Sequence, residues 1–226
     1  MKFVDNHEEE TQKEENRSGV GSGFLFIISI IIITFVLAGG MMLESAKPII
    51  YLYPDEEMDV FVYLDYNGKL EYTWPVYDDV WRVRAFPDGT LINLVDNKEY
   101  SYLFWEGRTN AIKCDFSKGF VVRGADTAVF LQETLAHIGL TPREYNEFIV
   151  YWMPLMQDNA WNLISFQYET YTDNAVLTIE PRPDSMLRVY MAFKPLSYPI
   201  NIPPQEFTPF ERKGFTVVEW GGSEVR

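Results

Sequence analysis

The sequence predicts an α+β protein that is mostly antiparallel β, with a single β-rich soluble domain, an inserted helical hairpin and one preceding transmembrane helix. Three observations lead to this prediction. An uncharged apolar run lies near the N-terminus, apolar residues then recur with a period of two, and a stretch in the middle of the chain has a helical period.

The apolar run covers residues 24–43, and thirteen of its residues are Phe, Leu, Ile or Val. A helix of this length spans about 30 Å, which matches the hydrocarbon core of a bilayer. We therefore expect residues 24–43 to contact the lipid bilayer as a transmembrane helix. A cleaved signal peptide is the alternative, but the run is longer than the roughly 7–15 apolar residues typical of one.

The flanks of this run predict its surroundings. Residues 1–23 form a polar tail that is too rich in charged and amide side chains to build a core, so we expect disorder. Lys13 and Arg17 precede the run and Lys47 follows it. Because positive residues favour the inner side, the N-terminus is predicted to be cytoplasmic and the C-terminal domain extracytoplasmic, at the cell membrane.

Charge and composition exclude several classes of function. The net charge is −14, which repels phosphate backbones, so no nucleic-acid partner is expected. One Cys and two His leave neither an internal disulfide nor a zinc-type cluster. We therefore predict no metal and no cofactor.

From Lys47 onward the pattern is that of short antiparallel strands separated by turn residues. Asn67-Gly68 is typical of a tight hairpin, and residues 112–116 and 119–123 are expected to form another. The remaining strands are predicted over residues 49–53, 58–65, 69–74, 80–86, 90–95, 99–105, 161–168, 176–179, 187–193 and 215–220.

The helical period appears at Ala128, Leu131, Leu135 and Ile138. Gly139 should end this helix, and Thr141 with Glu144 forms a capping box that begins a second one. Residues 148–153 have no polar face and stop at Pro154, so we interpret them as a buried strand. A Pro-rich arm is expected over residues 195–209, within a β-rich extracytoplasmic domain that covers residues 47–222.

Two carboxylates beside aromatic residues are the candidate catalytic groups: Glu106, after Trp105, and Glu219, before Trp220. Two carboxylates in one cleft can act as acid and as base or nucleophile on a glycosidic bond, while aromatic rings stack on the sugar. The candidate ligand-binding residues are Tyr100, Tyr102, Phe104, Trp105 and Trp220. The alternative is a core aromatic ladder whose carboxylates pair with Arg or Lys.

Four stretches are similar to an uncharacterised, mainly bacterial family of membrane-anchored or secreted domains: KPIIYLYP at 47–54, YSYLFWEG at 100–107, NEFIVYWMP at 146–154 and GFTVVEWGG at 214–222. The resemblance implies one coherent domain in a bacterial setting, and it implies no activity.

The sequence thus favours a single-pass membrane protein that displays an acidic β-rich binding or assembly module outside the cytoplasm, with an envelope protein or a glycan as partner. The alternative is a membrane-anchored hydrolase or carbohydrate-binding domain that uses Glu106 and Glu219.

Overall fold

The computed structural model describes residues 43–225, with side chains from Pro48 onward. The predicted polar tail lies outside these residues, and so does the predicted transmembrane helix apart from Leu43, which begins a strand. Within residues 43–225 no helix is both long and apolar enough to cross a bilayer.

The described chain contains twelve strands and a small number of helices. The strands are β1 (Leu43–Tyr53), β2 (Met58–Tyr66), β3 (Lys69–Trp74), β4 (Trp81–Ala85), β5 (Leu91–Asn93), β6 (Glu99–Tyr100), β7 (Leu103–Thr109), β8 (Phe120–Arg123), β9 (Trp161–Gln167), β10 (Ala175–Glu180), β11 (Ser185–Leu196) and β12 (Thr216–Glu224). The helices are the short η1 (Gly124–Asp126), then α2 (Thr127–Ile138), α3 (Pro142–Met156) and the short α4 (Glu169–Thr172).

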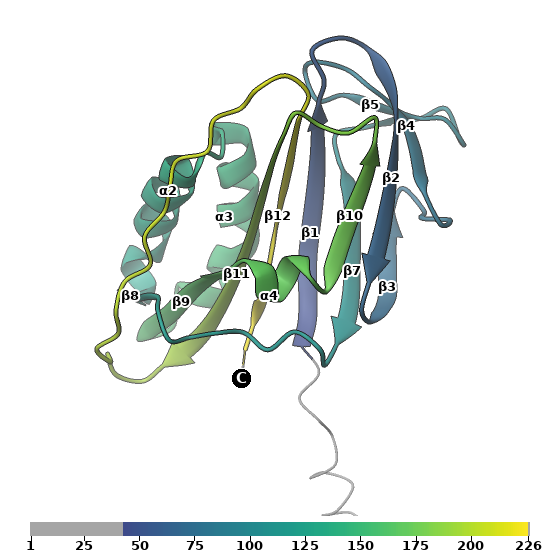
Figure 1. Ribbon diagram of the computed structural model, residues 1–226. Helices are drawn as coiled ribbons and strands as arrows, with labels where there is room; N and C mark the ends of the chain where they lie inside the picture. The colour runs from purple at the N-terminus through teal and green to yellow at the C-terminus, as the bar shows by residue number, and fades with distance from the viewer. Residues whose placement is uncertain (1–42, 226) are drawn as a thin grey trace, which may run out of the picture. The chain divides into compact units, whose positions relative to one another are not determined.

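These elements form three layers (Figure 1). A large sheet of seven strands has the order β3-β7-β1-β12-β11-β9-β8, and a small sheet of five has the order β10-β2-β4-β5-β6. The helices α2 and α3 pack on one side of the large sheet and the small sheet packs on the other. Every named strand pair is antiparallel except β11 with β12, so the prediction of a mostly antiparallel α+β fold is confirmed.

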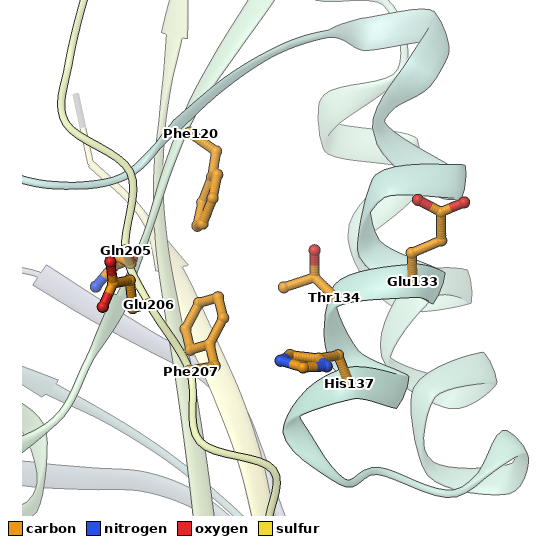
Figure 2. A pocket seen from close by; sticks show the side chains of 7 residues that line it. All are labelled: Phe120, Glu133, Thr134, His137, Gln205, Glu206 and Phe207. Atoms are coloured by element: carbon orange, nitrogen blue, oxygen red, sulfur yellow. The ribbon is translucent and has the colours of Figure 1, made fainter.

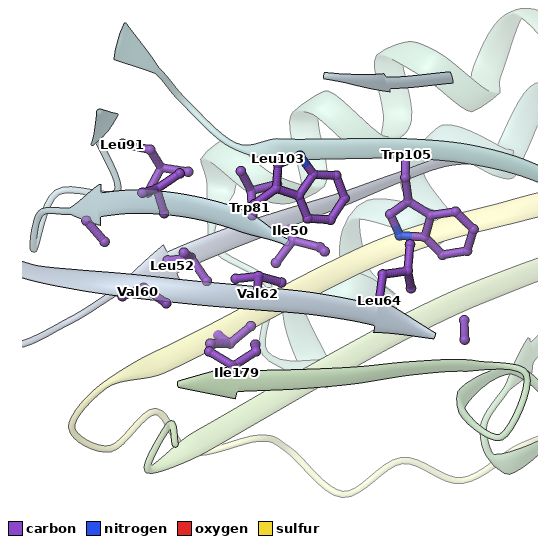
Figure 3. Close-up of a cluster of buried hydrophobic side chains, with 14 of the residues drawn as sticks. Ile50, Leu52, Val60, Val62, Leu64, Trp81, Leu91, Leu103, Trp105 and Ile179 are labelled. Carbon is purple, nitrogen blue, oxygen red and sulfur yellow. The ribbon is translucent and has the colours of Figure 1, made fainter. Parts of the chain in front are cut away.

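Two separate cores result, because successive side chains of a strand point to opposite faces. On β1, Ile50 and Leu52 enter the core between the two sheets, which Figure 3 shows together with Val62 and Trp81. Tyr51 of the same strand enters the core beneath the helices. The period-two pattern of the sequence therefore reflects two buried faces of the large sheet.

The helical hairpin forms as predicted, but its second helix is longer. Gly139, with φ of 124°, ends α2, and the Thr141 backbone N–H donates to the Glu144 side chain at 2.7 Å, so the predicted capping box is confirmed. The prediction of a strand over residues 148–153 was wrong, because these residues continue α3.

The strand was predicted wrongly because an apolar residue also occupies the outer face of α3. Phe148 and Trp152 are fully buried, whereas Val150 between them is 74 % exposed. Pro154 lies near the end of α3 and has no N–H to donate to the carbonyl of Val150, four residues earlier. Val150 is exposed, so this missing hydrogen bond falls on an exposed turn of the helix.

Three strand predictions were also wrong. The chain crosses from the small to the large sheet between β6 and β7, so residues 99–105 are not one strand. Asn67-Gly68 joins β2 and β3, which lie in different sheets, and is no hairpin. Residues 112–116 are irregular: the Asp115 backbone bonds to the side chains of Gln167 and Ser165 instead of to a strand.

The last strand, β12, continues through Gly221 and Gly222 to Glu224, beyond the predicted end at residue 220. A Cβ on Gly222 would clash with the Met191 carbonyl oxygen and would lie 2.9 Å from the Trp152 ring. The glycine therefore lets β12 pass close beneath α3. Residues 197–215, called the arm below, connect the parallel strands β11 and β12 and run alongside α2, where they contact β8 and β9 (Figure 1).

Candidate functional site

Glu219 lies on β12, is fully buried and faces the core between the sheets. Arg188 Nε on the neighbouring β11 donates to Glu219 Oε2 at 2.6 Å, and Trp105 Nε1 donates to Oε1 at 3.3 Å. Burial alone would lower the pKa of Arg188, but the charge of Glu219 beside it gives a net rise. Both oxygens of Glu219 are therefore occupied within a buried ion pair.

Glu106 lies on the opposite face of the same sheet. On β7 the buried Trp105 enters the core between the sheets, whereas Phe104 packs against the core on the helix side. Because side chains alternate, Glu106 shares the face of Phe104. The structure does not bring Glu106 and Glu219 into one cleft.

The predicted aromatic ligands also divide into two groups. Tyr100, Trp105 and Trp220 are buried, and the Tyr100 hydroxyl donates to Asp96 Oδ2 at 2.7 Å. These three side chains are core components. Tyr102 and Phe104 are half-buried and lie at the helix-side face of the large sheet, so they stay accessible in part.

A β-bulge on the edge strand β3 extends this helix-side face with two more rings. Leu70 is opposite Gly107 of β7, but Tyr72 is already opposite Glu106, so the register shifts by one residue at Glu71. Without the bulge, Leu70 and Tyr72 would face the same side. With it, Leu70 packs into the core between the sheets and Tyr72 points to the open side.

Tyr72 is 55 % exposed and Trp74 is 48 % exposed, which shows that the helix layer does not extend over β3. The Tyr72 ring lies 5.9 Å from the Phe104 ring, and the Trp74 ring meets the edge of Tyr100 at 5.6 Å. We call Tyr72, Trp74, Tyr102 and Phe104 the aromatic platform.

A polar row on β1 and α3 borders the platform. The buried Tyr51 hydroxyl donates to Glu147 Oε2 at 2.7 Å, and its ring meets the Tyr102 ring edge-on at 5.9 Å. The pKa of Tyr51 is raised, first by burial and then by Glu147, and burial with the Glu147 charge also raises the pKa of Tyr102. Both hydroxyls therefore stay protonated as donors, and Glu147 and Glu106 provide acceptor oxygens beside the rings.

Sequence reasoning missed Tyr72 and Trp74. Residues 69–74 were predicted as a strand, and strict alternation would give Leu70, Tyr72 and Trp74 one common face. Nothing in the sequence of β3 marks the bulge at Glu71, since it arises from pairing with β7.

A hollow of about 470 Å³ lies near the start of α3 and is lined in part by Tyr53 and Arg143. Arg212 also lines it, but its guanidinium contacts Glu144 and lies over the Tyr53 ring at 5.4 Å. Arg143 stands beside Asp88, so opposite charges meet at the rim. This balance of charge does not favour an anionic ligand.

The comparisons with known proteins give one relative. No family model matches the chain, and no solved structure matches it. The chain is 43 % identical over 67 residues to a Butyrivibrio fibrisolvens protein described as an uncharacterized protein in the bglA 3′ region. The match covers 28 % of this chain and 68 % of that protein. The chain belongs to the family of that protein.

Membership of this family brings no activity with it, because the relative is itself uncharacterised. The resemblance of the four stretches to a mainly bacterial family of membrane-anchored or secreted domains stays a prediction. What the site can do follows from its geometry alone. Among residues 43–225 no three His, Cys, Asp or Glu side chains could hold a metal ion together. The platform and the residues that border it combine flat rings, hydroxyl groups and carboxylate oxygens.

Proposed function

We propose that the protein is a single-pass membrane protein that displays a polysaccharide-binding domain outside the cytoplasm, with the aromatic platform as its binding face. The observation that carries this proposal is the exposure of Tyr72 and Trp74, at 55 % and 48 %, on a sheet face that the helices leave open. A large aromatic ring buries about 150–250 Å² when it is enclosed, and these two neighbouring rings leave about half of their surface in water.

The rings suit the apolar faces of sugar residues. Tyr72 and Trp74 are two residues apart on one strand, so their Cα atoms are separated by about 6.7 Å along a straight line. Contacts with Phe104 and Tyr100 hold the two rings in place. A ring that is already ordered loses little entropy when it binds.

The polar groups suit sugar hydroxyls, and the charge defines which polysaccharides fit. Glu106 and Glu147 lie beside the rings as hydrogen-bond acceptors. The net charge of −14 repels polyanions, so the ligand class is a neutral polysaccharide. A protein partner is less well matched, because a standard interface buries about 800 Å² on each side and the platform contains few exposed rings.

Display on a membrane rests on the sequence of residues 24–43, which is apolar and uncharged. On an insertion scale its thirteen Phe, Leu, Ile and Val residues contribute about −4 to −8 kcal/mol in total. A tethered domain gains from weak, repeated contacts, since a fixed ligand surface raises the effective concentration of binding sites.

A sedimentation assay with the full-length protein tests this proposal. The protein, kept in a detergent without a sugar headgroup, is mixed with insoluble cellulose, chitin or xylan, and with pectate as a polyanionic control. We expect binding to at least one neutral polymer and none to pectate. Tyr72→Ala with Trp74→Ala should weaken the binding by about tenfold or more, which corresponds to at least about 1.4 kcal/mol.

The matched control is Tyr198→Ala, because Tyr198 is 72 % exposed on the arm and lies outside the platform. It should bind like the unmodified protein. Equal binding by the platform double variant, or no binding of the unmodified protein to any of the neutral polymers, would contradict the proposal.

A further inference from the structure

Two contacts place the helix α3 beside the aromatic platform. The Phe148 ring meets the Trp220 ring of β12 at 5.3 Å, so α3 lies over the middle of the large sheet. On the next strand, β1, the Tyr51 hydroxyl donates to Glu147 of the same helix. Only β7 and β3 follow β1 toward this edge of the sheet. We call the helix-side face of β7 and β3 the open strip, and two strands are about 10 Å wide.

The helix α3 runs along the strands and not across them. Phe148 contacts Trp220, and the Trp152 ring, one turn later in the helix, lies beside Gly222, two residues later in β12. Four helical residues and two strand residues both advance by about 6–7 Å, so the axes of α3 and β12 are nearly parallel (Figure 1). A helix with its side chains is about 10–12 Å across. The helix therefore forms a wall along one side of the open strip.

The rings of the open strip do not share one plane. The Tyr72 and Phe104 rings have centroids 5.9 Å apart and planes 54° apart. The bulge at Glu71 increases the local twist of β3 at the same place. Rings that rest on the flat face of a crystalline polymer must be parallel to that face and to each other. Tilted rings suit a single chain, because its successive sugar residues can turn relative to one another.

Carboxylate oxygens lie both on the strip and on the wall beside it. Glu106 on β7 is opposite Tyr72 of β3, and Glu147 on α3 accepts from Tyr51. Both carboxylates are half-buried, so each keeps part of its surface in water. A wide, flat ligand has to pass above α3 and misses Glu147. Only a ligand narrow enough to lie beside the helix reaches the rings and Glu147 together.

We propose that the aromatic platform binds one polysaccharide chain, which lies along β3 and β7 beside α3, and that it does not bind the flat face of a crystalline polymer. The chain stacks on Tyr72 and Phe104, and its hydroxyls donate to Glu106 and Glu147. This inference rests on the proposed function, since it specifies the form of polysaccharide that the same platform binds.

The hollow beside the arm is a second place where a sugar ring can stack. It has a volume of about 570 Å³, and Figure 2 shows Phe120 and Phe207 on one side with Thr134 and His137 of α2 on the other. The strands β3 and β8 are the two outer strands of the large sheet, six strand spacings apart, which is about 29 Å. Signals from this hollow therefore serve as an internal reference for binding at the open strip.

The first test compares two forms of one polymer. The full-length protein, in a detergent without a sugar headgroup, is sedimented with the neutral polysaccharide that it binds, in crystalline form and in a swollen, non-crystalline form. We expect binding to the swollen form to be tighter by about tenfold or more. Soluble oligosaccharides of the same polymer should displace the protein, with an affinity that rises with chain length until the chain fills the strip.

Two-dimensional NMR of the full-length protein with the longest soluble oligosaccharide locates the chain. The backbone signals of Tyr72, Tyr102 and Glu147 should shift together in a saturable way, because one chain along the strip contacts β3, the start of β7 and α3. The signals of Thr134 and Phe207 should stay in place.

Glu147→Gln tests the contact with the wall. The replacement keeps the shape of the side chain and an oxygen that accepts from Tyr51, so the fold is preserved. We expect oligosaccharide binding to weaken by about three- to tenfold, because a hydrogen bond to a neutral amide is weaker than one to a carboxylate. The matched control is Asn146→Ala, at an exposed residue one turn before the exposed Val150, on the outer face of α3. It should bind like the unmodified protein.

Three results would overturn the inference: equal binding to the crystalline and the swollen polymer, oligosaccharide shifts at Phe207 without shifts at Tyr72, and a Glu147→Gln variant that binds as tightly as Asn146→Ala. In the first and third of these cases the proposed function still stands if Tyr72→Ala with Trp74→Ala weakens the binding. Binding to no form of any neutral polymer would contradict the proposed function and this inference together.

Discussion

Two similar Trp and Glu pairs of the large sheet point their side chains in opposite directions. Trp105-Glu106 on β7 turns its Trp toward the small sheet and its Glu toward the helix side, whereas Glu219-Trp220 on β12 does the reverse. Trp105 and Glu219 therefore meet in the core between the sheets, joined by a hydrogen bond of 3.3 Å.

The comparison teaches that the covering layer, and not the local motif, decides the role of a residue. Between the sheets a carboxylate must be paired, and Glu219 has Arg188. On the helix side the cover ends before β3, so the same kind of residue, Glu106, borders an accessible platform. Of the predicted pair of catalytic carboxylates, Glu219 is thus part of a buried ion pair and Glu106 lies beside the aromatic platform.

Between the two faces, the largest loss of stability should come from Arg188→Met, which leaves Glu219 buried without its cation. We expect a loss of about 3–5 kcal/mol in the free energy of unfolding. Urea denaturation of the full-length protein measures it. The matched control is Arg182→Met at an exposed Arg, which should stay within about 0.5 kcal/mol.

The double variant Arg188→Met with Glu219→Gln sharpens this prediction, since removing both charges should recover part of the loss. A loss below about 1 kcal/mol in Arg188→Met would show that Glu219 is not buried as an ion.

A smaller effect should follow from Gln205→Ala, which tests how the arm covers the opposite edge of the large sheet. The change removes the side-chain hydrogen bonds to the Phe166 N–H and carbonyl. We expect a loss of about 1–3 kcal/mol in the free energy of unfolding and faster amide exchange at Phe166. Gln132→Ala, at an exposed Gln of α2, is the control that should change neither quantity. Slow exchange at Phe166 in Gln205→Ala would contradict this account of the arm.

The smallest effect should come from Glu106→Gln, because Glu106 lies on the accessible face. We expect the free energy of unfolding to change by less than about 1 kcal/mol. The same urea titration used for Arg188→Met makes the two faces directly comparable. A loss as large as that of Arg188→Met would mean that the helix-side face around Glu106 is structural.

Much of the fold follows from sequence patterns, because local signals decide it. The capping box at Thr141 and Glu144 and the glycine stop at Gly139 depend on neighbouring residues, and both are present. The strand at residues 148–153 was predicted wrongly because the exposed Val150 removes the polar face by which a surface helix is recognised.

The candidate site was harder to predict, because its geometry depends on which strands pair. The bulge at Glu71, which turns Tyr72 outward, exists only through pairing with β7. The burial of Glu219 depends on Arg188 of β11, which lies far from it in the sequence and becomes its neighbour through the parallel pair of β11 and β12. Tyr102 and Phe104, two of the residues predicted to bind a ligand, are half-buried, and their binding role stays a prediction.

The emission of Trp74 tests most directly the claim that the open end of the large sheet is a sugar-binding face. Trp74 is 48 % exposed, whereas Trp81, Trp105, Trp152 and Trp220 are almost fully buried. Stacking on a sugar removes Trp74 from water, so a soluble oligosaccharide of the bound polymer should shift the tryptophan emission to shorter wavelengths in a saturable way. Trp74→Phe should abolish the shift, and the control Trp161→Phe, at a half-buried Trp of β9, should keep it. A shift that persists in Trp74→Phe, or no shift in the unmodified protein, would contradict the claim.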